Sequence, residues 1–203
     1  MSSQRIRFGI VGTGTNAHRF AEAIKDVSNA ELVAVASRTK ENAEKFGNEF
    51  NIPLRFDSYE KMAQSDKIDA AYIAVPHSLH IECSCLMMNN KKHVLCEKPP
   101  ARNASEVREI KEAAEKSDKC LMFGFLTRFG EDLLYVKDYI DSGKMGKLLY
   151  AETARISRCS GRKGWFVSKE KAGGGALIDG NIHEIDAVLY LMGYPKPKVV
   201  MGF

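Results

Sequence analysis

Three small residues near the N-terminus have the types and the spacing of a phosphate-binding turn. Gly12, Gly14 and Ala17 hold the fixed positions of the segment GTGTNA, which matches the pattern GxGxxG with alanine at its last position. The first glycine allows a tight turn, the second lets a pyrophosphate approach bare backbone, and Ala17 keeps helix and strand close. N–H groups at the start of the following helix would bind the phosphates. The segment predicts a dinucleotide site; the alternative is a glycine turn without a ligand.

The end of the second predicted strand bears on which dinucleotide binds. Domains that select NAD usually carry an acidic residue here, which accepts a hydrogen bond from the ribose 2′-hydroxyl. This chain has Ser37 and Arg38 instead. Ser37 can donate a hydrogen bond, and the planar guanidinium of Arg38 suits a 2′-phosphate. We therefore predict NADP(H) over NAD(H); the alternative is that Arg38 and Lys40 form a solvated basic turn.

Lys98 follows a predicted strand, His93–Cys96, and precedes two prolines. In a doubly wound sheet, ligands bind beyond the carboxyl ends of the strands. The prolines restrict the backbone that carries the lysine. A lysine in a half-desolvated crevice can polarise a carbonyl or hydroxyl oxygen and assist its proton transfer. We predict a functional role for Lys98; the alternative is a strand-end lysine in water.

Two rows of residues run along a long helix predicted over residues 175–192. The apolar row is Ile178, Ile182, Ile185, Leu189 and Met192. The neighbouring ionisable row is Asp179, His183, Asp186 and Tyr190, about 100° around the axis. Polar groups that border a buried stripe are typical of an interface or a site. Asp186 either orients His183 or pairs with a surface cation. The alternatives are a structural Asp–His pair and a metal held by Asp179, His183 and Asp186; we predict no metal.

The elements that would position these residues change in kind after residue 123. Before it, short β-rich runs alternate with amphipathic helical stretches, which is typical of a Rossmann-type, doubly wound parallel sheet. The predicted strands are Ile6–Val11, 32–36, Leu54–Phe56, 70–75, His93–Cys96 and 120–123. Asn103 and Glu106 resemble a capping box at the start of a helix. After residue 123 we predict a helix over 131–141, a strand over 148–156, the long helix and a strand over 198–203.

This organisation predicts two domains, residues 1–123 and residues 124–203. Two strands and two helices are few for a stable second domain, so we expect that α+β domain to be incomplete or completed by another chain.

Composition excludes several classes of protein. Apolar residues make up 44% and charged residues 28%, which is typical of globular proteins rather than disordered ones. The net charge of +4 is spread along the chain, so we predict no nucleic-acid partner. Without an apolar run of membrane-spanning length or a secretory signal, we expect no membrane partner and a cytoplasmic location. The five cysteines, Cys83, Cys85, Cys96, Cys120 and Cys159, suggest reduced thiols, and a CxC pair alone is a weak metal signal.

Taken together, the motifs resemble the glucose–fructose oxidoreductase, inositol dehydrogenase and rhizopine-catabolism (Gfo/Idh/MocA) family. The glycine turn, residues 75–80 (VPHSLH) and residues 97–99 (EKP) carry the resemblance, and residues 124–129, 141–146 and 173–183 continue it. Residues 70–129 are also similar to the dimeric dihydrodiol dehydrogenase branch, which tends to carry tyrosine in place of His183. Asn181 stands where the family usually has glycine, a departure that bears on the substrate.

The resemblance implies a dinucleotide domain followed by an α/β domain that carries the substrate and commonly the oligomer interface. It implies Lys98, Asp179 and His183 as catalytic residues. The implied cofactor-binding residues are Gly12, Gly14, Thr15, Asn16, Ala17, Ser37, Arg38, Pro76, His80, Glu97 and Lys98. The expected function is hydride transfer between NADP(H) and a sugar, polyol or related hydroxy-carbonyl compound in a homo-oligomer, either a dimer or a tetramer. The alternatives are a non-catalytic NADP(H) sensor and a redox-assisted glycoside hydrolase.

Overall fold

The computed structural model describes residues 5–156 and 163–202, and Cys159 lies outside them. The chain divides into two compact units. The first contains residues 5–124 together with Lys163–Gly173, and the second contains residues 125–156 and 174–202. The sequence analysis assigned Lys163–Gly173 to the second domain. In the structure this segment is hydrogen-bonded to His77 and Arg102, which explains its place in the first unit.

A six-stranded parallel sheet forms the centre of the first unit. Its strands are β1 (Ile6–Val11), β2 (Ala30–Ala36), β3 (Leu54–Phe56), β4 (Ala70–Ile73), β5 (His93–Cys96) and β6 (Leu121–Phe123). They lie in the order β3-β2-β1-β4-β5-β6. Every pair is parallel, so the carboxyl ends of all six strands lie along one edge. This confirms the predicted Rossmann-type fold, and only the strand predicted at 70–75 is clearly shorter than expected.

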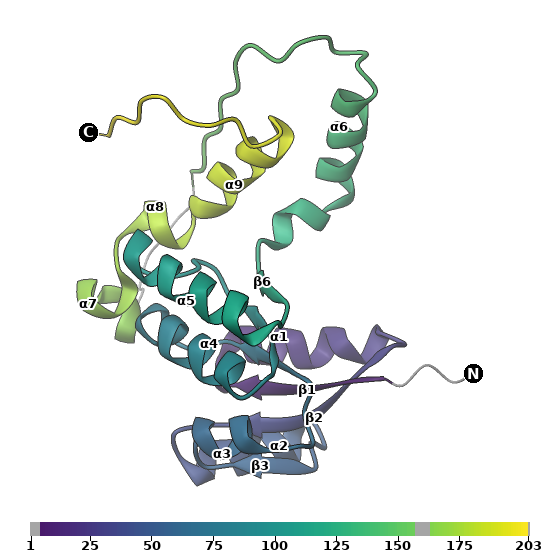
Figure 1. The fold of residues 1–203 in the computed structure, drawn as a ribbon, viewed down its shortest axis with the longest axis vertical. Coiled ribbons are helices and arrows are strands. Elements are labelled where there is room, and N and C mark those ends of the chain that lie inside the picture. The colour runs from purple at the N-terminus through teal and green to yellow at the C-terminus, as the bar shows by residue number, and fades with distance from the viewer. Residues whose placement is uncertain (1–4, 157–162, 203) are drawn as a thin grey trace. The chain divides into compact units, whose positions relative to one another are not determined.

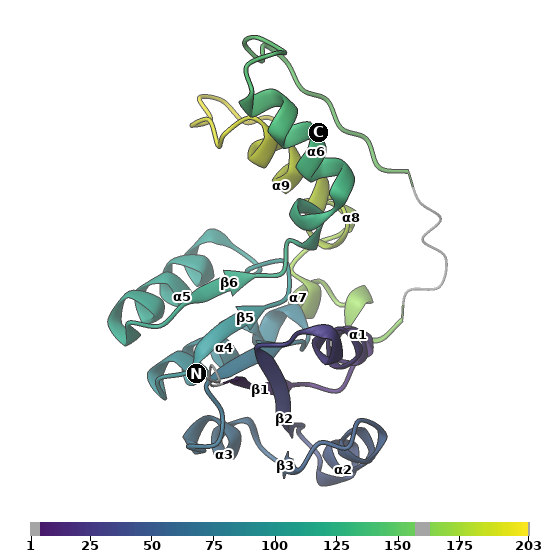
Figure 2. The ribbon, with the colours of Figure 1, turned by 90° about the vertical axis from the view of Figure 1, so that its right-hand side faces the viewer.

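Helices cover both faces of this sheet, as Figures 1 and 2 show. The helices of the first unit are α1 (Thr15–Ala23), α2 (Lys40–Glu49), α3 (Tyr59–Gln64), α4 (His80–Asn89), α5 (Ala104–Ser117) and α7 (Lys169–Ala172). Its 3₁₀ turns are η1 (Ile24–Asp26), η2 (His77–Leu79) and η4 (Gly164–Val167). Helices α1 and α2 share a core with one face, built around Ala17 and Phe46. Helices α3, α4 and α5 pack on the other face, where Met62, Met87 and Ala113 are buried.

The start of α5 differs from a complete capping box. The Asn103 side chain accepts a hydrogen bond from the Glu106 backbone N–H at 3.0 Å, as predicted. The Glu106 carboxylate accepts from the backbone N–H of Arg102 at 2.9 Å and from its guanidinium, and its further bond to Asn103 is to the side chain rather than to the N-cap N–H. Glu106 is nearly buried, so the arginine fork provides the donors that its carboxylate needs.

The second unit is helical, which corrects three predictions. Its elements are η3 (Leu126–Phe129), α6 (Glu131–Asp141), α8 (Ala176–Asp179) and α9 (Ile182–Leu191). Helix α6 has the predicted bounds. Residues 148–156 and 198–202 are not strands, since no described strand pairs with them, and Phe203 lies outside the described residues.

The predicted helix over 175–192 is also interrupted, after Asp179. Both Gly180 N–H and Asn181 N–H reach the carbonyl oxygen of Ala176 at 3.0 Å, and the second of these bonds is one residue longer than the helical pattern. Such a widened turn breaks a helix.

No helix in the described part of the chain is both long and apolar enough to span a membrane.

Candidate active site

The glycine turn joins the ends of β1, β2 and β4. The Gly12 N–H donates to the carbonyl oxygen of Ala36, at the end of β2, at 2.9 Å. Gly12 has φ +101°, and a Cβ there would lie 2.4 Å from the carbonyl oxygen of Ala74. Only glycine combines this backbone conformation with this close approach. The first position of the motif is therefore required by the fold itself.

Gly14 is different, because the space beside it is open. A Cβ at Gly14 would meet no atom within 4 Å, and the residue has an ordinary extended conformation at φ −85°. It is the N-cap of α1 and gives the helix no side-chain cap. Thr15 begins the helix at the surface, Asn16 is half-buried, and Ala17 is fully buried against the sheet. An open backbone surface at a helix N-terminus is where a pyrophosphate would fit.

The turn after β2 has one buried and one exposed side chain. Ser37 is 6% exposed, and its N–H donates to the carbonyl oxygen of Phe56 at 3.1 Å. Arg38 is exposed, so its guanidinium is accessible to an anion. Thr39 caps α2 by accepting from the Asn42 N–H at 3.4 Å.

The loop after β5 carries Glu97 and Lys98, both half-buried, followed by the buried Pro99 in a cis peptide bond. The Tyr72 hydroxyl donates to Oε1 of Glu97 at 2.6 Å. Burial, followed by the nearby Glu97 carboxylate, raises the pKa of Tyr72, so the phenol stays a donor. Sequence reasoning missed Tyr72. The register of β4 and β5 indicates the contact: Tyr72 pairs with Leu95. Glu97 lies two residues after Leu95, so its side chain points to the same face of the sheet as that of Leu95.

The side chain of His80 contacts the backbone of this loop. Its ring is completely buried, with Nδ1 2.8 Å from the carbonyl oxygen of Pro99 and Nε2 3.1 Å from that of Val75. Burial lowers the pKa of His80 to about 4, so the ring is neutral at pH 7. A neutral ring can donate to only one of the two oxygens. His80 is predicted to bind the cofactor; this geometry favours an indirect part, through the position of the Lys98 loop. Pro76, a second predicted contact, is half-buried just after β4.

In the second unit, His183 lies on α9 beside η3. Its Nδ1 is 3.4 Å from the Thr127 hydroxyl, and its ring stands edge-on to Phe125 with centroids 6.4 Å apart. Asp179 is the last residue of α8, on the other side of the Gly180–Asn181 interruption. Both Asp179 and His183 are half-buried. Thr127 is a further site residue that sequence reasoning missed, because its contact with His183 spans 56 residues.

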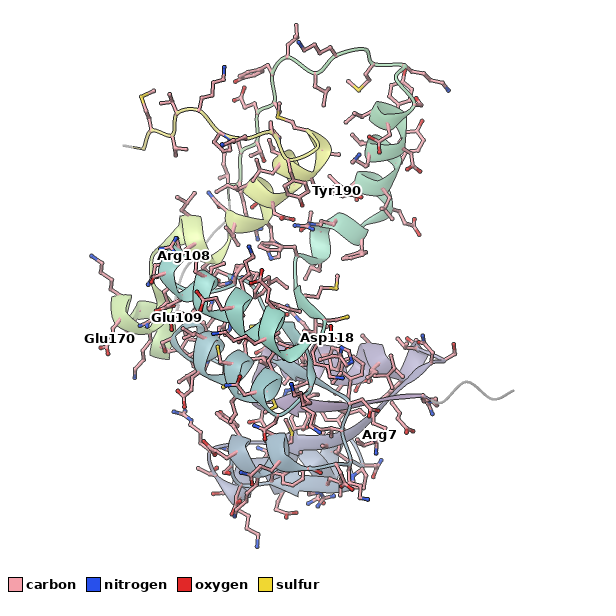
Figure 3. The ribbon with its side chains drawn as sticks, in the orientation of Figure 1. Arg7, Arg108, Glu109, Asp118, Glu170 and Tyr190 are labelled. Carbon is pink, nitrogen blue, oxygen red and sulfur yellow. The ribbon has the colours of Figure 1, made fainter. Side chains whose placement is uncertain are left out.

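Two roles are predicted for Asp186, orienting His183 or pairing with a cation, and in the structure it pairs with the cation Arg128. The Arg128 Nε donates to Oδ2 of Asp186 at 2.7 Å, and a second, shorter bond joins Nη2 to Oδ1. Asp186 is 7% exposed. The Arg128 guanidinium also lies 5.3–5.8 Å from the ring centroids of Phe125, Tyr190 and Tyr194, of which Tyr190 is labelled in Figure 3. The ion pair joins η3 to α9 and so supports the helix that carries His183.

The metal alternatives gain no support from these groups. In residues 5–156 and 163–202, no three His, Cys, Asp or Glu side chains gather as a metal site would require. At the CxC pair, burial raises the pKa of Cys83 to about 12 and also raises that of Cys85. Both groups are therefore protonated thiols at neutral pH when no metal is bound.

The sheet order and the glycine turn after β1 define the class of protein, a Rossmann dinucleotide-binding domain followed by a second unit. Residues 6–125 match the oxidoreductase family described as having an NAD-binding Rossmann fold, and residues 133–203 match the Gfo/Idh/MocA C-terminal domain. The chain belongs to the Gfo/Idh/MocA oxidoreductase family.

Similar proteins are named as dehydrogenases of sugars and polyols. The chain is 35% identical to the D-glucoside 3-dehydrogenase of Escherichia coli K12, over 98% of this chain and 58% of that protein. It is 35% identical to the scyllo-inositol 2-dehydrogenase (NADP(+)) of Bacillus subtilis strain 168, over 98% of this chain and 62% of that protein. A levoglucosan dehydrogenase solved with NADH superposes with a TM-score of 0.81 at 28% identity, over 94% of this chain and 54% of that one. The chain thus spans about three fifths of the length of these curated relatives.

The predicted catalytic residues are divided between the two units. Lys98 belongs to the first unit, whereas Asp179 and His183 belong to the second. In the first unit, Glu97 and His80 are held at the Lys98 loop. In the second unit, Thr127 lies beside His183. That all three catalytic residues act on one substrate remains a prediction.

The two glycines of the turn should respond differently to alanine. Gly12→Ala forces a Cβ against the Ala74 backbone at a positive φ, so the free energy of unfolding should fall by about 2–4 kcal/mol. Gly14→Ala is the matched control and should cost at most about 1 kcal/mol, because its Cβ would meet nothing within 4 Å and alanine is only a poorer N-cap than glycine. Urea denaturation measures both. Equal losses in the two variants would contradict the assigned roles.

The buried His80 should make stability depend on pH. Its pKa is lowered from 6.5 to about 4 by burial, so the unfolded chain binds a proton in this range that the folded chain does not. The free energy of unfolding should therefore fall, by at most about 3 kcal/mol, as pH falls from 6.5 to 4. Urea titrations at several pH values measure the slope. The control is His80→Asn, which cannot titrate and should flatten it; an unchanged slope would remove His80 as the cause.

Proposed function

We propose that this chain forms the cofactor domain and part of the substrate site of an NADP(H)-dependent dehydrogenase or reductase. Its substrate would be a CH–OH group, or the matching carbonyl, of a sugar, polyol or related compound. The observation that carries the proposal is the glycine turn, whose open surface beside Gly14 fits a pyrophosphate, in a chain that matches both domains of the family. The names of the relatives support the substrate class.

The chain's residues fit a dinucleotide along the carboxyl edge of the sheet. Gly12, Gly14, Thr15 and Asn16 would hold the phosphates, and Ser37 with Arg38 would hold the 2′-phosphate-bearing ribose. A bound nicotinamide cofactor supplies the two-electron acceptor or donor of the reaction. The preference for NADP(H) rests on the exposed Arg38 and on the absence of an acidic residue at positions 36–38. The relatives differ here, one being named for NADP(+) and another solved with NADH.

Three side chains would handle the proton and charge at the substrate oxygen. The Lys98 ammonium would stabilise negative charge that develops on this oxygen. The His183 imidazole would accept or return its proton, with Nδ1 held near Thr127. Asp179 would orient substrate hydroxyls and His183. Lys98 is supported in turn by the backbone that His80 contacts and by the neighbouring Glu97–Tyr72 bond.

We further propose a homo-oligomeric, cytoplasmic enzyme with a carbohydrate-like substrate and no nucleic-acid or membrane partner. The support for assembly is the family resemblance of the second unit. The support for the other statements is the chain's dispersed charge and its composition.

Removing Arg38 should reverse the cofactor preference. In Arg38→Ala, the affinity for NADP⁺ should fall about 10–100-fold, as expected for a lost hydrogen bond to a charged group, while that for NAD⁺ changes little. Lys40→Ala, which removes the exposed cation at the start of α2, is the control and should affect both cofactors slightly. Calorimetric titration of the unaltered protein and both variants with each cofactor measures the six dissociation constants. NAD⁺ binding as tightly as NADP⁺ in the unaltered protein would refute the preference.

Removing either proposed catalytic side chain should lower turnover sharply while cofactor binding remains measurable. In protein expressed from its complete coding sequence, Lys98→Met and His183→Asn should each lower kcat by about 10²–10⁴-fold. The exposed Lys111→Met is the control and should keep full activity. Absorbance of the reduced cofactor measures turnover on scyllo-inositol, a methyl glucoside and levoglucosan. Cofactor binding without turnover on any sugar or polyol would favour the sensor alternative instead.

A further inference from the structure

The segment Lys163–Gly173, here called the return segment, lies within the first unit although it follows residues of the second. It consists of η4 and the short helix α7. It carries Trp165 and Phe166, whose rings stack with centroids 3.8 Å apart and an interplanar angle of 24°. Trp165 is the single tryptophan of the sequence.

His77 makes the first attachment of the return segment. It begins η2, just after β4, and is 4% exposed. Its Nδ1 lies 2.9 Å from the carbonyl oxygen of Ala172, which is itself 3% exposed. Because a carbonyl oxygen can only accept, this nitrogen carries the hydrogen. The same imidazole stands edge-on to Trp165, with centroids 4.6 Å apart at 70°. One side chain thus contacts both ends of the return segment.

Arg102 makes the second attachment. It lies four residues after Lys98, and its Nη1 donates to the carbonyl oxygen of Glu170 at 2.9 Å. The rest of the guanidinium is held by Glu106, with Nε to Oε1 at 3.0 Å. Burial alone would raise the pKa of Glu106, but the hydrogen bonds from Arg102 outweigh it and lower the pKa, so the carboxylate stays ionised. Figure 3 labels Glu170 on α7 and the exposed Arg108 on α5.

Both attachments satisfy backbone groups that a helix end leaves without partners. The carbonyl oxygens of Glu170 and Ala172 lie in the last turn of α7, where no further helical N–H can reach them. The chain then turns at Gly173, with φ +78°. A Cβ at Gly173 would lie 2.8 Å from Cβ and Cγ of Arg102, so only glycine lets the return segment lie against this arginine.

The attachments come from two loops at the same edge of the sheet. His77 follows β4, and Arg102 follows the Lys98 loop after β5, and these two strands are neighbours. Rossmann domains bind their ligands outside this carboxyl edge. The return segment is therefore tied to the backbone that carries Lys98 rather than to a remote surface.

We propose that His77 and Arg102 are positioning residues that hold the Trp165–Phe166 ring pair beside the Lys98 loop, and that the reaction depends on this placement. The proposal rests on the proposed function, in that a nicotinamide cofactor must bind at this edge. Neither residue is proposed to touch the reacting atoms. Their effect is transmitted through the return segment.

Tryptophan fluorescence tests the attachments directly, without cofactor. His77→Phe keeps a ring beside Trp165 but removes the donor to Ala172, whereas His77→Asn keeps a donor near the Nδ1 position. In His77→Phe and Arg102→Met, we expect the ratio of molecules with the return segment attached to molecules with it detached to fall by about tenfold. Acrylamide should therefore quench Trp165 more strongly in both variants. His77→Asn and Arg102→Lys should restore part of the protection. Arg108→Met, on the exposed side of α5, should leave quenching unchanged. Unchanged quenching in His77→Phe and Arg102→Met would overturn the proposal.

Binding of NADPH separates this proposal from the proposed function. Reduced nicotinamide absorbs where tryptophan emits, so excitation of Trp165 should produce emission from bound NADPH. We expect this sensitised emission to fall in His77→Phe and Arg102→Met, with the dissociation constant of NADPH changed less than about threefold because the glycine turn is intact. If the unaltered protein does not bind NADPH, the proposed function fails, whatever the quenching shows. If NADPH binds and every variant gives equal sensitised emission, the positioning role fails alone.

Turnover provides the last distinction from a purely structural role. With NADP⁺ as the oxidant and scyllo-inositol, a methyl glucoside or levoglucosan as substrate, the two variants should lower kcat/KM by about tenfold, with cofactor affinity changed less than about threefold and with recovery in Arg102→Lys. A loss of melting temperature with kcat/KM unchanged would show that the attachments only stabilise the fold.

Discussion

The close approach of Gly12 to the backbone after β4 is the constraint on which the rest of the first unit depends. Its N–H is bonded to Ala36 at the end of β2, and the side-chain position that it lacks is filled by the carbonyl oxygen of Ala74. Three strand ends are thereby fixed at one point. Because all strands are parallel, the loops that leave them lie along a single edge. A bulkier residue at position 12 would separate these loops before any ligand arrived.

Beyond the glycine turn, two buried histidine rings lie against backbone carbonyl oxygens and hold the neighbouring loops in place. Val75, just beyond Ala74, presents its carbonyl oxygen to His80, and the other nitrogen of that ring faces Pro99. His77, three residues before His80 and also buried, lies with its Nδ1 at hydrogen-bond distance from the carbonyl oxygen of Ala172. Main-chain positions change little when surface side chains are substituted. Supports of this kind therefore hold the Lys98 loop through its main chain.

The sequence predicted what is determined locally and failed where a distant partner decides. The strands of the sheet were predictable because each is an apolar run between turn residues, and helix α6 because its pattern is local and a glycine, Gly143, follows its end at Asp141. Residues 148–156 alternate like a strand, but no strand in the described part of the chain pairs with them, and alternation alone does not form a sheet. The helix over 175–192 is interrupted at Gly180–Asn181, where one displaced hydrogen bond to Ala176 outweighs a continuous apolar row.

The candidate site shows the same division between local and distant information. Gly12, Gly14 and Lys98 were recognisable because motif and strand end are adjacent in sequence. The contacts of His77 with Ala172 and of Arg102 with Glu170 join residues 95 and 68 positions apart, and no spacing rule relates them. Arg128 and Asp186, 58 positions apart, are a similar case, since the helical row placed Asp186 near His183 but could not supply its partner. Buried polar groups need partners. A nearly buried acid or histidine that has no partner close in sequence is therefore expected to be paired by a distant segment, as Asp186 is by Arg128 and His77 by the backbone of Ala172.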